Sequence, residues 1–204
     1  MLSFKTVEPH TLELLRSLMA IPLLSGTRLV GGTSLALQYG HRNSVDLVFF
    51  GSLDDDLIAF RGCLENIGHV NILKETKSIR IYDIDGVKID FVDYSRYSWL
   101  SDSIEKEGLR LASPKDIAAM KINAIEGRGS RKDFVDIYYL LQHFSLNDIL
   151  DFYQKKYPDH SLFRALMSLT YFDDAEKQVM PKMYSTESWD EMKDFIIKEV
   201  AKIK

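Results

Sequence analysis

The chain has 204 residues, of which 46% are hydrophobic and 27% are charged, so it can bury a substantial core and is not a disordered protein. Its 26 Lys and Arg against 30 Asp and Glu give a net charge of −4, which excludes the strongly basic domains that bind nucleic acids non-specifically but leaves room for a local basic groove. The single cysteine, Cys63, favours a reducing compartment, and the longest apolar stretch, 18–24, is interrupted by Pro22. We therefore expect a cytoplasmic protein that is not associated with a membrane.

Patterns in the first half predict a mixed α/β domain. The predicted segments are a helix at 9–20, a short strand near 28–30, a helix that Gly40 ends, a strand at 45–50, a helix over 53–67, and strands at 71–74, 78–83 and 87–93. The Asp85-Gly86 pair predicts a type I′ hairpin turn between the last two strands.

The second half is predicted to be a helical bundle, because glycines and β-branched runs become rare after residue 113. The expected helices are 114–126, 131–143, 146–156, 161–169 and 187–202. Ser113-Pro114 and Ser130 with Asp133 have the spacing of helix N-caps. We thus predict an α+β protein with a domain over 1–110, built on a sheet with flanking helices, and a helical domain over 111–204.

A turn of small residues lies between the first predicted strand and its helix. Gly31-Gly32-Thr33-Ser34 offers backbone N–H groups, a helix N-terminus and two hydroxyls to an anion such as a triphosphate. The simpler interpretation is a tight structural turn, since glycine is the usual residue at positive φ.

Two aspartates lie within otherwise apolar strands, where a carboxylate is costly to bury without a partner. One is Asp46. The other, Asp90, shares its strand face with Lys88 and Val92 because side chains alternate. Each could be an ordinary edge or capping carboxylate, but two acids after a Gly-Gly turn favour a site for metal and phosphate.

These features resemble the nucleotidyltransferase superfamily, and within it the AbiEii/AbiGii toxin family of bacterial abortive-infection and toxin–antitoxin systems. Five segments in the same order carry the resemblance: 29–38, 41–50, 89–90, 121–136 and 169–175.

The resemblance implies Mg²⁺-dependent transfer of a nucleotide from an NTP to an acceptor, with RNA such as tRNA as the acceptor and a cognate antitoxin as a partner. It implies that Gly31, Gly32 and either Thr33 or Ser34 hold the β- and γ-phosphates. Asp46 and Asp90 would be metal ligands, with Asp90 alternatively taking the acceptor's proton.

The resemblance further implies that Lys121 contacts the triphosphate and that Asp133 is a catalytic acid. Each has a simpler interpretation: Lys121 with Arg128 as a solvated basic stripe, and Asp133 as a capping partner of Ser130. Arg42 could pair with phosphate or with Asp46, or be solvated.

Two further features of the second half have their own simpler interpretations. Asp136 with Lys132 could be a surface pair one helical turn apart. Tyr171 and Phe172 could stack on a base, although packing is the commoner role of such a pair.

One position departs from the family pattern, which has two carboxylates two residues apart in the first acidic strand. Here the strand is Asp46-Leu47-Val48, so a valine takes the place of the second acid on the same face. Mg²⁺ can bind through one or two carboxylates plus substrate phosphates, so a single-metal site remains open. The alternative is a catalytically impaired protein that binds a nucleotide or a partner without transfer.

Overall fold

A computed structural model describes residues 1–203 and divides into two compact units. Unit 1 comprises Met1–Ser98 and Ser103–Ala112, and unit 2 comprises Trp99–Asp102 together with the chain from Ser113 onward. Unit 1 holds all the strands, and unit 2 is helical. The predicted α+β class is confirmed.

Unit 1 is built on a seven-stranded mixed sheet with the order β3-β4-β5-β2-β1-β7-β6. The strands are β1 (Thr27–Leu29), β2 (Leu47–Gly51), β3 (Val70–Glu75), β4 (Ile79–Ile84), β5 (Val87–Asp93), β6 (Ile104–Lys106) and β7 (Leu109–Leu111). The helices of this unit are η1 (Phe4–Thr6), α1 (Pro9–Ala20), η2 (Pro22–Leu24), α2 (Gly31–Tyr39) and α3 (Leu57–Glu65).

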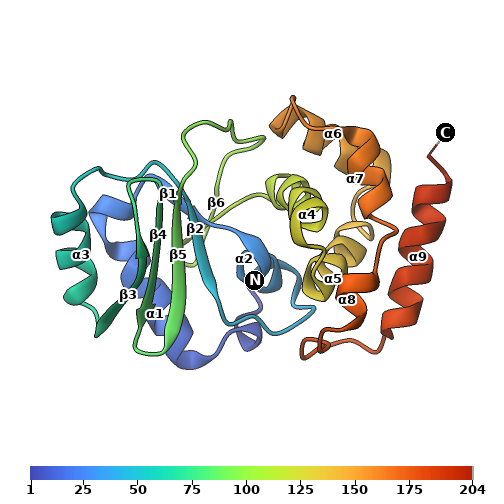
Figure 1. The fold of residues 1–204 in the computed structure, drawn as a ribbon. Coiled ribbons are helices and arrows are strands. Elements are labelled where there is room, and N and C mark those ends of the chain that lie inside the picture. Colours follow the sequence, from blue (N-terminus) through green and yellow to red (C-terminus); the bar gives the residue numbers. More distant parts are fainter. Residues whose placement is uncertain (204) are drawn as a thin grey trace. The chain divides into compact units, whose positions relative to one another are not determined.

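The core of unit 1 lies on one face of this sheet. Strand alternation directs Leu47 and Phe49 of β2 and Ile89 and Phe91 of β5 to that face, where all four are fully buried. Helices α1 and α3 lie on this side of the sheet (Figure 1) and contribute buried residues such as Leu15 and Phe60 to the same cluster. The other face of β2 and β5 carries the half-buried Val48 and Asp90.

Two hairpins differ in how visible they are in the sequence. The Asp85-Gly86 turn has φ values of 51° and 82°, which confirms the predicted type I′ turn. The β6–β7 hairpin was not predicted, because its strands have only three residues each and its turn is Glu107-Gly108, with φ values of 54° and 79°. A glutamate at positive φ is uncommon, so the sequence carries only a weak turn signal there.

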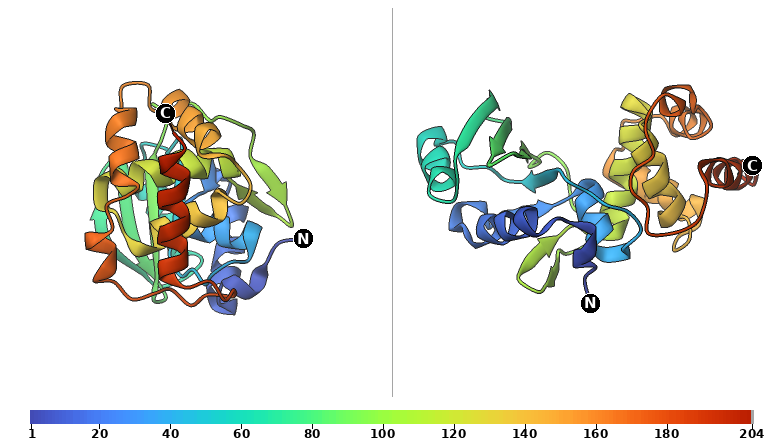
Figure 2. Two further views of the ribbon diagram at one scale, coloured as in Figure 1. Left: turned by 90° about the vertical axis from the view of Figure 1, so that its right-hand side faces the viewer. Right: turned by 90° about the horizontal axis from the view of Figure 1, so that it is seen from below.

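Unit 2 contains α4 (Pro114–Arg128), α5 (Arg131–Leu140), α6 (Leu146–Lys156), α7 (Leu162–Ser168), α8 (Asp173–Glu176) and α9 (Trp189–Ala201). All five predicted helices are present, and the short α8 is additional. Helix α4 is the central one, since it packs against α5, α6 and α7, whereas α9 lies on the outside of the unit and packs against α5 (Figure 2). The predicted cap at Ser113 is confirmed, because its hydroxyl accepts from the Asp116 N–H.

A fully buried ion pair in unit 2 shares its carboxylate with the shorter chain segment of the unit, Trp99–Asp102. Lys156 Nζ lies 2.8 Å from Asp116 Oδ1, and neither side chain is exposed. The backbone N–H groups of Leu100 and Ser101 also donate to the Asp116 carboxylate, at 2.9 and 3.3 Å. Asp116 thereby ties the segment Trp99–Asp102 to α4 and α6.

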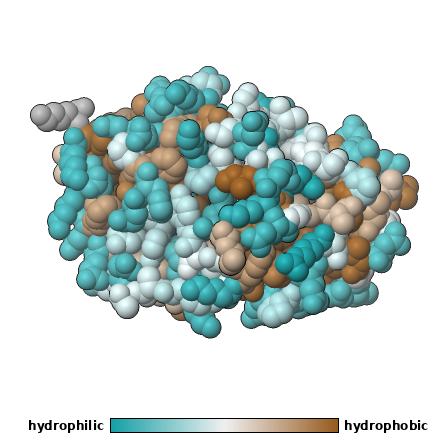
Figure 3. Space-filling model, turned by 180° about the vertical axis from the view of Figure 1, so that it is seen from behind, coloured by the Kyte–Doolittle hydropathy of each residue, from teal (hydrophilic) through white to brown (hydrophobic). Residues whose placement is uncertain are grey.

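Within residues 1–203, no helix combines the length and apolarity that a membrane crossing requires. On the face shown in Figure 3, hydrophobic residues lie in small groups among hydrophilic ones.

Candidate functional site

A backbone hydrogen bond holds the Gly31-Gly32 turn against β2, and the backbone of the turn is accessible at Gly31. Val30 caps α2, and its N–H donates to the carbonyl of Val48 in β2 at 2.8 Å. Gly31 has a φ of +69°, and a Cβ built there would have no atom within 4 Å. A ligand can therefore approach this backbone at the N-terminus of α2, where the helix dipole favours an anion.

The second glycine makes room for an arginine. A Cβ at Gly32 would lie 2.1 Å from Arg42 Nη2, so a larger residue here would force the buried guanidinium to move. Arg42 is 3% exposed and donates through Nη1 to the carbonyl of Asn43 at 2.9 Å. The solvated interpretation of Arg42 is thus wrong, because the side chain is buried against the turn and brings a permanent positive charge to it.

The hydroxyls of the turn point into unit 1. Thr33 Oγ1 lies 2.8 Å from Ser44 Oγ and also donates to the Asp46 carbonyl in a short bond. Ser34 Oγ accepts from Gln38 Nε2 at 3.2 Å, and both hydroxyl residues are buried. These bonds hold the turn in place, while a role of Thr33 or Ser34 in binding phosphate stays a prediction.

Of the two predicted strand carboxylates, Asp90 lies in β5, whereas Asp46 lies just before the neighbouring parallel strand β2 and not within it. Asp46 directly precedes β2, and Val48 is the register partner of Asp90 in β5. From strand spacings the Cα atoms of Asp46 and Asp90 are roughly 8 Å apart, close enough for their side chains to approach one ion. Lys88 Nζ lies 3.0 Å from Asp90 Oδ1 and 3.1 Å from Oδ2, and this contact was not predicted.

The donor set determines which metal chemistry the site accommodates. Within the described chain, no group of three or more His, Cys, Asp or Glu side chains is arranged to hold a metal ion. Mg²⁺, however, prefers carboxylate oxygens and usually combines one or two of them with water and phosphate oxygens. Asp46 and Asp90 therefore fit a magnesium ion that arrives with a nucleotide, rather than a metal held by the protein alone.

The predicted residues of unit 2 form a separate buried ion network. Lys121 Nζ lies 2.8 Å from Asp133 Oδ1 and 2.5 Å from Asp136 Oδ2, with the lysine side chain 6% exposed and both carboxylates fully buried. Arg128 Nε also contacts Asp133, at 2.8 Å, and Ser130 Oγ donates to the same carboxylate. This network joins α4 to the start of α5.

The simpler interpretations from the sequence do not describe these side chains. Lys121 is buried rather than solvated, and Asp136 is fully buried and contacts this lysine, so Asp136 does not lie at the surface. Ser130 is the N-cap residue of α5 but makes no side-chain cap bond: its hydroxyl donates to the Asp133 carboxylate instead of accepting from the Asp133 N–H. Triphosphate contact by Lys121 and a catalytic role of Asp133 remain predictions, and either would require these side chains to leave their ion pairs.

Two neighbouring cations keep the Asp133 carboxyl of this network ionised. Burial by itself would raise the pKa of Asp133, but the Lys121 ammonium and the Arg128 guanidinium outweigh it and hold this pKa well below its ordinary value of 3.8. Asp133 is therefore ionised throughout the neutral range.

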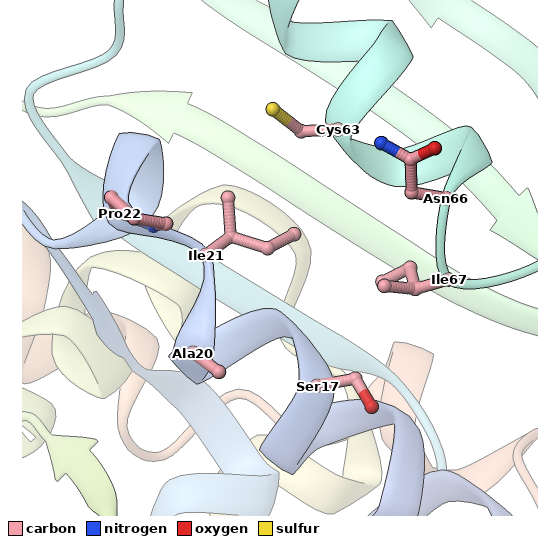
Figure 4. Close-up of a pocket in the computed structure, with 7 residues that line it drawn as sticks. All are labelled: Ser17, Ala20, Ile21, Pro22, Cys63, Asn66 and Ile67. Atoms are coloured by element: carbon pink, nitrogen blue, oxygen red, sulfur yellow. The ribbon is translucent and has the colours of Figure 1, made fainter.

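A hollow of about 430 Å³ lies elsewhere in unit 1, between the end of α1 and α3 (Figure 4). Its walls include Ile21, Pro22, Cys63 and Ile67, with Ser17 and Asn66 as the polar members and no charged side chain. Such a lining does not suit a triphosphate or a metal, so the Gly-Gly turn with its carboxylates remains the candidate site.

Tyr171 is exposed, whereas Phe172 packs on Phe134 with ring centroids 4.8 Å apart.

Two comparisons with known proteins found matches that extend over most of the chain. Residues 13–202 match the family described as "Nucleotidyl transferase AbiEii toxin, Type IV TA system". A protein from Aquifex aeolicus (strain VF5), named "Uncharacterized protein aq_aa25", is 31% identical over 194 residues, which cover 92% of this chain and 93% of that protein.

Proposed function

The chain belongs to the AbiEii nucleotidyl transferase toxin family, and we propose that it transfers a nucleotide from an NTP to an acceptor hydroxyl with the help of Mg²⁺. The observation that carries the proposal is the fastening of the Gly31-Gly32 turn to the start of β2. The Val30–Val48 and Thr33–Asp46 bonds keep an anion-binding helix N-terminus beside a strand carboxylate.

Each group in this part of unit 1 has a task in such a reaction. The backbone N–H groups at Gly31 and Gly32 bind phosphate oxygens, and the buried Arg42 guanidinium adds a positive charge beneath the turn. Asp46 and Asp90 would hold a magnesium ion, which would neutralise charge that develops on the phosphates. The acceptor oxygen attacks the α-phosphorus in line and pyrophosphate leaves; in the alternative in which Asp46 alone holds the ion, Asp90 takes the acceptor's proton.

We assign RNA such as tRNA as the acceptor class because the family resemblance implies it. The net charge of −4 gives this assignment no support, since a negatively charged protein does not attract a polyanion. An antitoxin encoded with the protein is the corresponding partner. A reducing cytoplasm is the compartment that the single cysteine favours.

Val48 supports a second candidate function. It is the register partner of Asp90 at the position where the family pattern has an acid, so the protein holds fewer metal ligands than a two-metal transferase needs. In this alternative the protein binds a nucleotide at the turn but transfers none of it.

A paired assay separates the two functions. The protein is incubated with each of the four α-labelled NTPs, Mg²⁺ and total RNA, and label in RNA is measured beside equilibrium NTP binding. Transfer that disappears in Asp90→Asn but persists in Asp151→Asn, a control on the exposed surface of α6, supports the transferase. Mg²⁺-dependent binding with no transfer supports the second function, and neither binding nor transfer contradicts both.

A further inference from the structure

Lys88 forms an ion pair with Asp90, the carboxylate that the proposed metal ion would need. Its Nζ lies 3.0 and 3.1 Å from the two oxygens of Asp90, two residues along the same strand and on the same face. The lysine side chain is 47% exposed and the Asp90 side chain 24% exposed. The contact is thus an ion pair at the boundary with solvent and not part of the core.

The neighbours of Asp90 on adjacent strands are apolar. Val48 of β2 is its register partner on one side and Ile81 of β4 on the other. Asp83, the register partner of Lys88 across β4, accepts instead from the Gly86 N–H of the hairpin turn at 3.2 Å. The positive charge that contacts Asp90 therefore comes from Lys88 on its own strand. On the β2 side, where the family pattern has a second acid that would favour a divalent ion, the neighbour is the neutral Val48.

We propose that Lys88 is a tethered cation that neutralises Asp90 in the metal-free protein and makes metal binding depend on the nucleotide. A metal ion that arrives alone must displace the ammonium and then lie beside it, which like charges disfavour. A triphosphate gives the ammonium another anion to bind, so that Asp90 becomes available to the metal. This inference rests on the proposed function for the identity of the anion, whereas the competition between Lys88 and metal does not.

The direct test measures metal binding without nucleotide. Mn²⁺ affinity is determined for the parent, Lys88→Met, and the double variant Lys88→Met/Asp90→Asn. Lys155→Met serves as the matched control, because Lys155 pairs with Asp151 at 2.6 Å on an exposed helix surface. Thermal unfolding of each variant verifies that it is folded, and Lys88→Gln replaces Lys88→Met if the latter is not.

We expect Lys88→Met to bind Mn²⁺ at least tenfold more tightly than the parent, Lys155→Met to match the parent, and the double variant to lose the gain. When an NTP is present, the difference between the parent and Lys88→Met should shrink. Equal Mn²⁺ affinity of the parent and Lys88→Met would overturn the proposal, as would a gain that survives Asp90→Asn. Both results can be obtained whether or not the protein transfers nucleotides, so they are independent of the proposed function.

Discussion

Two lysines of this protein pair with aspartates in opposite environments. Lys121 in unit 2 contacts two carboxylates that are fully buried, whereas the Lys88–Asp90 pair in unit 1 is open to solvent on one side. Breaking a buried pair leaves a charge without solvation, so the first pair is fixed. In the second pair the lysine is 47% exposed, so its ammonium can leave Asp90 for solvent or another anion at little cost. The exposure of an ion pair, more than its distance, therefore indicates which lysine is available to bind a ligand.

The largest effect is expected from Lys121→Met. It leaves Asp133 and Asp136 buried without their ammonium, which typically costs about 3 to 5 kcal/mol of unfolding free energy. Urea unfolding of the variant measures this loss, and Lys155→Met should leave the unfolding midpoint unchanged because its pair is exposed. A loss below about 1 kcal/mol would contradict the structural role that we give the network.

Acid should break the same network. The pKa of Asp133 in the folded protein is depressed by Lys121 and Arg128, so at acidic pH the unfolded chain binds more protons than the folded one. The stability from this group is fully present above its ordinary pKa and is lost as the pH falls toward the depressed value. Unfolding measured from pH 6 downward should show a steeper decline in the parent than in Asp133→Asn, and parallel declines would refute the assignment.

Gly32→Ala should disturb the turn in unit 1. The added methyl would meet Arg42 Nη2 at 2.1 Å, and overpacking of this kind costs about 1 to 3 kcal/mol. Because Arg42 must move, NTP affinity should fall as well. Gly62→Ala is the matched control: it lies within α3 with no atom near the new methyl, and alanine favours a helix. Equal stability and equal NTP affinity of the Gly32 and Gly62 variants would contradict both the packing of Arg42 against Gly32 and the role of this turn in NTP binding.

Val48→Asp restores the spacing of two acids that the family pattern has. Without metal, the new charge near Asp46 and Asp90 and the loss of a half-buried valine should cost about 1 to 3 kcal/mol. Mg²⁺ or Mn²⁺ with NTP should raise the melting temperature of the variant more than that of the parent, and transfer should increase. If neither happens, Val48 does not stand at a lost ligand position.

Much of the fold follows from local patterns, and the exceptions have physical causes. Ser113-Pro114 and Asp85-Gly86 mark element ends because one side chain or one backbone conformation is needed there. The β6–β7 hairpin lacks such a signal, since its strands are too short to display a period.

The candidate site was predicted only in part, because a sequence shows which residues carry charge but not which are buried. Lys121 and Asp136 have the spacing of helix-surface residues and lie in the core, held by partners on another helix. The contact of Lys88 with Asp90 follows from strand alternation, but the exposure that makes the pair exchangeable depends on the neighbouring strands.

The central claim is that the Gly31-Gly32 turn and the strand aspartates hold an NTP together with magnesium. Equilibrium NTP binding, measured with and without Mg²⁺ for the parent and Asp90→Asn, tests it most directly. We predict that the parent loses at least tenfold in affinity when Mg²⁺ is removed, and that Asp90→Asn binds equally weakly in both conditions because an amide lacks the charge that the ion requires. Identical Mg²⁺ dependence of the parent and the variant would contradict the account.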